Sequence, residues 1–168
     1  MSPLVEQLLE TAAALAALDQ RRPRSASLRR AVSTAYYALF HSLAELCADT
    51  LVGWKQSWDV FTPIYRSLEH ARTLTVLTAR ADPLGEQIER IGVAFRQLQE
   101  AREWADYNPE PHPDPRQTLD NIRFTREAAQ ELIDIARDAI EAVDALDPVL
   151  KLKLAARLIA RPRKEVRR

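Results

Sequence analysis

The stretch SASLRRAVSTAYYALFHSLAELCAD, residues 25–49, decides the fold of this chain. Its apolar residues return every three or four positions, which is the spacing of one face of an α-helix, and no glycine or proline interrupts it. Ser25 or Ser27 can cap the helix, since a serine hydroxyl accepts a hydrogen bond from an amide of the first turn. We therefore expect one long helix, whose core face carries Leu28, Val32, Leu39, Leu43 and Leu46.

On both sides of this stretch, a capping residue followed by proline marks where another helix should begin. Such pairs occur at Ser2-Pro3, Thr62-Pro63, Asp82-Pro83 and Asp147-Pro148. The expected helices cover residues 3–19, a segment from 63, 83–107, 116–146 and a short segment from 148. Between them we expect a basic linker at 20–25, a loop at 53–62 whose Trp54 and Trp58 fold over the bundle, and a rigid proline-rich loop at 108–115.

The composition is that of a helical protein with a single core. The 168 residues are 46% hydrophobic and 7% aromatic, and the apolar residues are mainly leucine and alanine, both strong helix formers. No alternating run of β-branched residues indicates a strand. We expect an all-α, up-and-down bundle of about five core helices over residues 1–146, with a short appended helix and a basic tail over 147–168.

The sequence argues against a membrane segment, a disulfide and a metal site. Its apolar stretches fall short of the roughly 20 residues that cross a bilayer, Cys47 is the single cysteine, and no basic, apolar leader is present. The three histidines His41, His70 and His112 lie on different elements, and there is no glycine-rich phosphate loop. We expect a cytoplasmic protein without a metal or other cofactor.

Charge is balanced overall, with 24 basic and 24 acidic residues, but it is unevenly distributed. Residues 148–168 contain eight basic side chains and one acidic one, and residues 21–30 contain five arginines and no acid. Two basic blocks on an otherwise acidic body can hold phosphates. Alternatively, each block is a solvated tail or loop, or the C-terminal tail alone docks on nucleic acid.

The helix expected over 83–107 contains the clearest departure from a purely structural pattern. Arg102 falls in the centre of its apolar stripe, and an arginine that faces a core needs a charged or hydrogen-bonded partner. Asp106, one turn later, can be that partner, although arginine before aspartate is the weaker order in an isolated helix. The pair is either a buried tie to a neighbouring element, or an anion-binding arginine held by Asp106 beside the Tyr107 hydroxyl.

Two further stripes run along the helix expected over 25–49. One has only small side chains and would let another helix approach closely, within the bundle or across a dimer interface: Ala31, Ala35, Ala38 and Ser42. The other is polar, and is either a solvated face or a polar groove: Arg30, Thr34, Tyr37, His41 and Glu45. In the next expected helix, Arg66 and His70 are spaced i and i+4. They form either an ordinary surface pair or an acid–base pair.

Three ordered segments between residues 29 and 109 resemble the HEPN superfamily. RRAVSTAYYALFH at 29–41 matches its Ser-x-x-Tyr-Tyr-Ala-x-Phe-His signature on a long early helix. YRSLEH at 65–70 and LQEAREWADYNP at 98–109 are similar to the Tyr-Arg-Ala-Leu-Asp-His and Arg-x-x-Ala-Asp-Tyr-Asp-Pro segments of one branch. The resemblance covers most of the bundle and does not extend to the basic tail.

The resemblance implies a homodimeric helical bundle that binds RNA or nucleotide phosphates. Active members are metal-independent endoribonucleases of toxin–antitoxin or defence systems, and use an arginine followed after four to six residues by a histidine. Here positions 107–109 are Tyr, Asn and Pro, so catalysis would need His41 or His70 beside Arg102. The alternative is a non-catalytic dimerisation module acting with a partner such as a nucleotidyltransferase or an antitoxin. The expected binding residues are Arg102, Asp106, Tyr107, Tyr37, Arg30 and Arg66.

Overall fold

The structure is a computed structural model that describes residues 1–18, 21–53, 55–80, 83–108 and 124–160. These ranges contain seven helices and no strand, so the expected all-α bundle is confirmed. None of the described helices has the length and apolar character needed to cross a bilayer. The helices are α1 (Pro3–Ala17), α2 (Ser25–Leu51), α3 (Trp58–Arg66), α4 (His70–Leu77), α5 (Glu86–Tyr107), α6 (Arg126–Asp144) and α7 (Pro148–Ile159).

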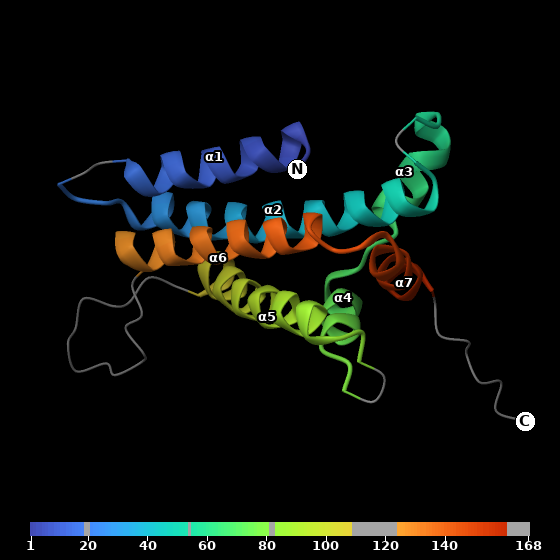
Figure 1. The fold of residues 1–168 in the computed structure, drawn as a ribbon. Helices are drawn as coiled ribbons and strands as arrows, with labels where there is room; N and C mark the ends of the chain where they lie inside the picture. Colours follow the sequence, from blue (N-terminus) through green and yellow to red (C-terminus); the bar gives the residue numbers. More distant parts are fainter. Residues whose placement is uncertain (19–20, 54, 81–82, 109–123, 161–168) are drawn as a thin grey trace, which may run out of the picture.

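The long helix α2 lies at the centre of the bundle (Figure 1). It contacts α1, α3, α5, α6 and α7, with α1 and α6 running alongside it and α3 near its C-terminal end. The short helix α4 packs against α5 and α7. Because α2 touches five other helices, its sequence sets the position of most of the core.

The stripe of small residues on α2 is covered inside the chain. Ala31, Ala35 and Ala38 have no exposed surface, and Ser42 is 7% exposed. Small side chains let a neighbouring backbone approach the helix closely, and here that neighbour belongs to the same bundle. Of the two uses expected for this stripe, the structure therefore shows close packing within the chain and leaves no surface there for a second copy.

Two of the predicted helix starts are confirmed, and the predicted cap of α2 is wrong. The Ser2 hydroxyl accepts a hydrogen bond from the amide of Val5, and Asp147 accepts one from the amide of Leu150. In α2, Ser25 is already helical, and the cap position belongs to Arg24, whose side chain makes no capping bond. The Arg24 carbonyl accepts from the amides at 27 and 28, so the first turn closes before either serine can cap it.

The predicted start at Thr62-Pro63 is wrong, because Pro63 lies inside α3. The carbonyl of Ser57 already accepts hydrogen bonds from the amides of Val60 and Phe61, so the helix begins a turn earlier. Pro63 then removes a single helical hydrogen bond from a short helix. Trp58, expected to fold over the bundle, is 77% exposed, which corrects that expectation, and Trp54 lies outside the described residues.

Helix α5 begins later than predicted from Asp82-Pro83. Gly85 occupies its cap position with a φ of 113°, a conformation that glycine adopts at little cost, and Pro83 precedes the helix. Helix α6 begins at Arg126 with Thr125 as its cap. Residues 124 and 125 are therefore not helical, and the expectation of a single helix over 116–146 is wrong there. Asp82 and residues 116–123 of the expected helix lie outside the described residues.

Gly92 lets α5 approach α4 closely. A Cβ added at Gly92 would lie 2.7 Å from the carbonyl oxygen of Leu77, and Leu77 itself is 1% exposed. Backbone atoms cannot rotate away as a flexible side chain does. The contact therefore requires either glycine or a shift of one helix against the other.

Gly92→Ala is expected to lower the free energy of unfolding by about 1–3 kcal/mol, the usual cost of overpacking a core. On an exposed helix face the same change would raise it by about 1 kcal/mol, because alanine is the better helix former. Urea denaturation distinguishes the two signs. Arg96→Ala, at an exposed position on the same helix, is the control and should be close to neutral; a gain in stability for Gly92→Ala would contradict the close contact.

Arginines from other elements satisfy the carbonyl groups at three helix C-termini. Arg126 donates to the carbonyls of Ala16 and Leu18 after α1, with N–O distances of 3.0 and 3.3 Å. The same arrangement closes α5 and α7: Arg29 donates to Ala105 and Asn108, and Arg72 to Leu158 and Arg157. A cation at this end also complements the helix dipole.

Arg126→Ala is expected to lower the free energy of unfolding by about 1–2 kcal/mol, since it leaves the last carbonyls of α1 without their donor. Arg137→Ala is the matched control on the same helix. Its salt bridge to Asp134 joins side chains that are 43% and 51% exposed, so its loss should cost less than about 0.5 kcal/mol. Equal stability of the two variants in urea denaturation would show that the contact to α1 contributes nothing.

Candidate functional site

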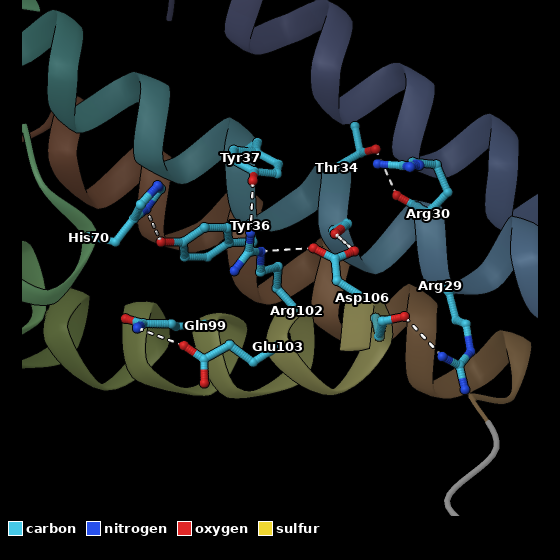
Figure 2. Close-up of polar contacts among 12 residues, drawn as sticks. Arg29, Arg30, Thr34, Tyr36, Tyr37, His70, Gln99, Arg102, Glu103 and Asp106 are labelled. Carbon is cyan, nitrogen blue, oxygen red and sulfur yellow. Dashed lines mark hydrogen bonds and ion pairs between the residues drawn. The ribbon is translucent and has the colours of Figure 1, made fainter. Parts of the chain in front are cut away.

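The site is built around Arg102, near the C-terminal end of α5 (Figure 2). Its Nε lies 2.9 Å from Oδ2 of Asp106, one turn later, and the two side chains are 18% and 23% exposed. The predicted pair is therefore formed. The guanidinium lies at the boundary between the core and solvent, and is not sealed inside.

The pair connects α5 to α2. Nη2 of Arg102 donates to the Tyr37 hydroxyl at 3.0 Å, and the Ser33 hydroxyl donates to Oδ1 of Asp106 at 2.5 Å. Both partners come from α2, so the order of arginine and aspartate along α5 is set by contacts between helices. This explains why a pair in the order that is weaker in an isolated helix is present here.

Three tyrosine rings surround the guanidinium. Its central carbon lies 5.9 Å from the ring centroid of Tyr36, 5.6 Å from that of Tyr37 and 5.4 Å from that of Tyr107. These distances are within the range in which an aromatic face attracts a cation. Tyr107 is 72% exposed, so one wall of the site is an aromatic ring open to solvent.

Arg102 keeps its positive charge in this setting. Partial burial opposes the charge, but the hydrogen bond to Tyr37 and the neighbouring Tyr107 and Asp106 outweigh it and raise the pKa of Arg102. Its cation is therefore a permanent feature of the site at any physiological pH.

His70, at the first position of α4, joins the site through Tyr36. Its Nδ1 lies 2.6 Å from the Tyr36 hydroxyl, and its ring stacks on Phe40 with centroids 4.0 Å apart. Burial, together with the charges of Arg102 and His41, lowers the pKa of His70, whereas burial raises the pKa of Tyr36. At neutral pH the imidazole is therefore uncharged and the phenol keeps its proton.

His41 forms a second histidine–tyrosine pair on the same side of α2. Its Nδ1 is hydrogen-bonded to the Tyr65 hydroxyl of α3, and the two rings stack with centroids 5.8 Å apart. Burial lowers the pKa of His41. The charge of His41 also contributes to lowering the pKa of His70, which places His41 at the margin of the site.

Of the residues predicted for binding or catalysis, the structure brings together Arg102, Asp106, Tyr107, Tyr37 and His70, with His41 at the margin. Arg30 and Arg66 are exposed, and no described contact joins either of them to Arg102. Figure 2 shows Arg30 nearer the N-terminal end of α2. Arg66 is the last residue of α3 and lines a cleft elsewhere, whereas His70 begins α4, so the expected pair on one helix is wrong. Residues 161–168, the end of the basic tail, lie outside the described residues.

Two members of the site, Ser33 and Tyr36, were not among the predicted site residues. Both are buried, and Tyr36 is 1% exposed, so each resembles an ordinary core position. The signal that identifies them is their spacing: with Tyr37 and Phe40 they follow i, i+3, i+4 and i+7, which places them on one helix face. A serine and two tyrosines on a buried face indicate a polar contact with another helix.

No group of three histidine, cysteine, aspartate or glutamate side chains in the described part of the chain is placed to hold a metal ion. The polar groups that the site brings together are the cation of Arg102, the carboxylate of Asp106, the imidazole of His70 and the tyrosine hydroxyls. This set can bind an anion and exchange one proton. No family model, curated protein or solved structure matches this chain.

The stability of the fold is expected to decrease as the pH falls through the ordinary histidine pKa of 6.5. His41 and His70 have lowered pKa values in the folded chain, so the unfolded chain binds more protons in this window. Urea denaturation between about pH 7 and pH 5 measures the slope. His70→Gln, whose amide can donate to or accept from the Tyr36 hydroxyl, should flatten the slope. An unchanged slope would mean that His70 is not kept uncharged in the folded chain.

Proposed function

We propose that this chain is a HEPN-like protein that binds RNA or nucleotide phosphates at Arg102. The observation that supports this most directly is the state of that side chain: a permanent cation, 18% exposed, held in one orientation by Asp106 and Tyr37. A fixed guanidinium at a solvent boundary is the group that proteins use to recognise phosphate oxygens. The segments at 29–41 and 98–109 that resemble the superfamily contain Tyr37, Arg102 and Asp106, and the segment at 65–70 contains His70.

The geometry suggests how a nucleotide would bind. Nε forms an ion pair with Asp106 without the geometry of a hydrogen bond, and Nη2 donates to Tyr37. Nη1 is the donor that we assign to a phosphate oxygen. The exposed ring of Tyr107, 5.4 Å from the guanidinium carbon, is placed to stack with a base. A phosphate and an adjacent base together would distinguish a nucleotide from inorganic phosphate.

The catalytic form of this proposal assigns His70 as the general base of a divergent, metal-independent endoribonuclease. If Nδ1 donates to the Tyr36 hydroxyl, Nε2 can take the proton of a ribose 2′-hydroxyl. The 2′-oxygen then attacks the phosphorus atom and Arg102 stabilises the added negative charge. The bond to the 5′-oxygen breaks, the 5′-oxygen takes a proton from water, and the protonated His70 returns its own proton to solvent. The products would be a 2′,3′-cyclic phosphate and a 5′-hydroxyl end, the outcome expected of a toxin–antitoxin or defence ribonuclease.

The first experiment is a binding titration of the purified chain with a short single-stranded RNA at several salt concentrations. Binding through phosphates must weaken as salt rises, and the absence of RNA affinity at low salt would refute the proposal. A version ending at Ala160 tests the tail separately. It keeps α7, whose Leu154 and Leu158 are buried, and should retain most of the affinity.

A second candidate is a non-catalytic module that dimerises or acts with a partner such as a nucleotidyltransferase or an antitoxin. The observation that favours it is the network from Ser33 through Asp106 and Arg102 to Tyr37, which joins two helices and can serve stability alone. In that case mutations in the network would change the stability of the fold, and RNA would show no salt-dependent binding.

A further inference from the structure

A cleft is lined by residues from the start of α1, from the C-terminal half of α2 and from α3, which lies at the C-terminal end of α2 (Figure 1). Its volume is about 650 Å³, within the roughly 300–1,000 Å³ typical of sites for small ligands. Neither Arg102 nor His70 lines it. It is therefore distinct from the site proposed for phosphate, and nothing in that proposal uses it.

One wall of this cleft is a row of aromatic rings on α3. Trp58 and Phe61 meet edge to face with centroids 5.6 Å apart, and Phe61 stacks on Tyr65 with centroids 6.2 Å apart. Trp58 is 77% exposed, and α3 has no buried residue. Trp58 and Phe61 thus present aromatic surface to the cleft, and Tyr65 lines it while also packing against the core.

The opposite wall is apolar with carboxylates set into it. Leu46 of α2 and Val143 of α6 contribute apolar surface, and Glu45, Asp49 and Asp144 contribute acidic groups. Glu45 is the partly buried carboxylate of the three, and the Ser2 hydroxyl donates to its Oε1 at 2.6 Å. Three basic groups also line the cleft. Lys151 donates to the carbonyl of Asp144, and the amino group of Met1 forms an ion pair with the Asp144 carboxylate. The side chain of Arg66 is exposed to solvent.

We propose that this cleft binds a small organic cation with an apolar body, such as an arylalkyl amine. Aromatic faces attract a cation, and the partly buried Glu45 carboxylate can accept a charge-assisted hydrogen bond from an ammonium group. The apolar walls would take up the carbon skeleton, which hydrated inorganic cations lack. The partly buried carboxylate of Glu45 disfavours an organic anion of the same shape.

The affinity for the cation is expected to depend on pH, because Glu45 binds it in the ionised form. Burial raises the pKa of the Glu45 carboxyl, and the charges of Asp144 and Asp49 raise it further, against the Ser2 hydrogen bond and the amino terminus. Because a cation favours the ionised carboxylate, its affinity increases as the pH rises through that pKa. The other titratable groups at the cleft are Tyr65, Arg66 and Lys151.

The test compares three probes with similar bodies: 2-phenylethylammonium, the neutral 2-phenylethanol and the anionic phenylacetate. Isothermal titration calorimetry on the intact chain at neutral pH is expected to show the ammonium binding at least about tenfold more tightly than the alcohol, as a charge-assisted hydrogen bond implies. Phenylacetate should be the weakest of the three. Equal affinity for ammonium and alcohol, tighter binding of phenylacetate, or no binding of any probe would overturn the proposal.

Three variants assign the preference to named side chains. Glu45→Gln keeps the acceptor for Ser2 and should remove the preference for the ammonium, while Trp58→Ala, at an exposed position, should weaken both the ammonium and the alcohol. Asp134→Asn removes an exposed carboxylate of α6 outside the cleft and should change neither. A preference that survives Glu45→Gln, or affinities that Trp58→Ala leaves unchanged, would rule out this cleft as the site.

Discussion

Arg102→Ala is expected to lower the affinity for single-stranded RNA by at least about tenfold, the loss that follows from removing one charge-assisted contact to phosphate. The far-UV circular dichroism spectrum should keep its helical form. Asp106 retains its hydrogen bond from Ser33 and is 23% exposed, so we expect the free energy of unfolding to fall by only about 1–2 kcal/mol. Fluorescence anisotropy at fixed salt measures the affinity.

Two matched variants separate binding from stability. Arg102→Lys keeps the charge but lacks the planar fork of the guanidinium, so its affinity should lie between those of the parent chain and the alanine variant. Asp106→Asn breaks the ion pair, keeps an acceptor for Ser33 and removes a negative charge beside the phosphate. Because Asp106 orients the guanidinium, this variant should also bind RNA less tightly than the parent chain, with a smaller loss than the alanine variant shows. If Arg102→Ala instead unfolds the chain, the ion pair is structural and the site assignment fails.

Phe95→Ala is expected to lower the free energy of unfolding by about 3–5 kcal/mol, the usual cost of removing a buried aromatic ring. Phe95 has no exposed surface, and its ring lies 5.4 Å from that of Tyr36, centroid to centroid. The resulting cavity would lie directly beside the tyrosine that holds His70. Urea denaturation should show the loss, and the His70 imidazole resonance should shift as Tyr36 moves.

The control for this change is Val93→Ala, two residues earlier on α5. Val93 is 63% exposed, so its truncation removes little buried surface and should change the free energy of unfolding by less than about 0.5 kcal/mol. Similar losses for the two variants would mean that the Phe95 side chain does not fill the core beside Tyr36.

The fold could be predicted from the sequence because its dominant signal is local. The apolar spacing of residues 25–49 and the caps at Ser2 and Asp147 depend on neighbouring residues in the chain, and both were interpreted correctly. Two of the errors share a physical cause, because at Ser25 and Pro63 the carbonyl of an earlier residue already closes the first turn. That residue is Arg24, directly before Ser25, in the first case and Ser57, six residues before Pro63, in the second. A capping side chain in the sequence does not reveal that competition.

The site could be predicted in part. Arg102 and Asp106 were identifiable because a charge interrupts an apolar stripe, and that irregularity is visible along a single helix. Ser33 and Tyr36 fit a core pattern, and their polar role depends on which helix α2 meets. The contact between Arg126 and the end of α1 could not be predicted for the same reason. Arg126 is 110 residues from Ala16 and 108 residues from Leu18 along the chain.

The most direct test of the central claim is an NMR titration of the chain with a short single-stranded RNA, observing the side-chain resonances of Arg102, Tyr107 and His70. We predict that the Arg102 Nε–H signal and the Tyr107 ring signals shift together as RNA is added, and that the His70 signals follow. Shifts confined to the basic segments 21–30 and 151–168, with Arg102 unchanged at saturation, would contradict the account.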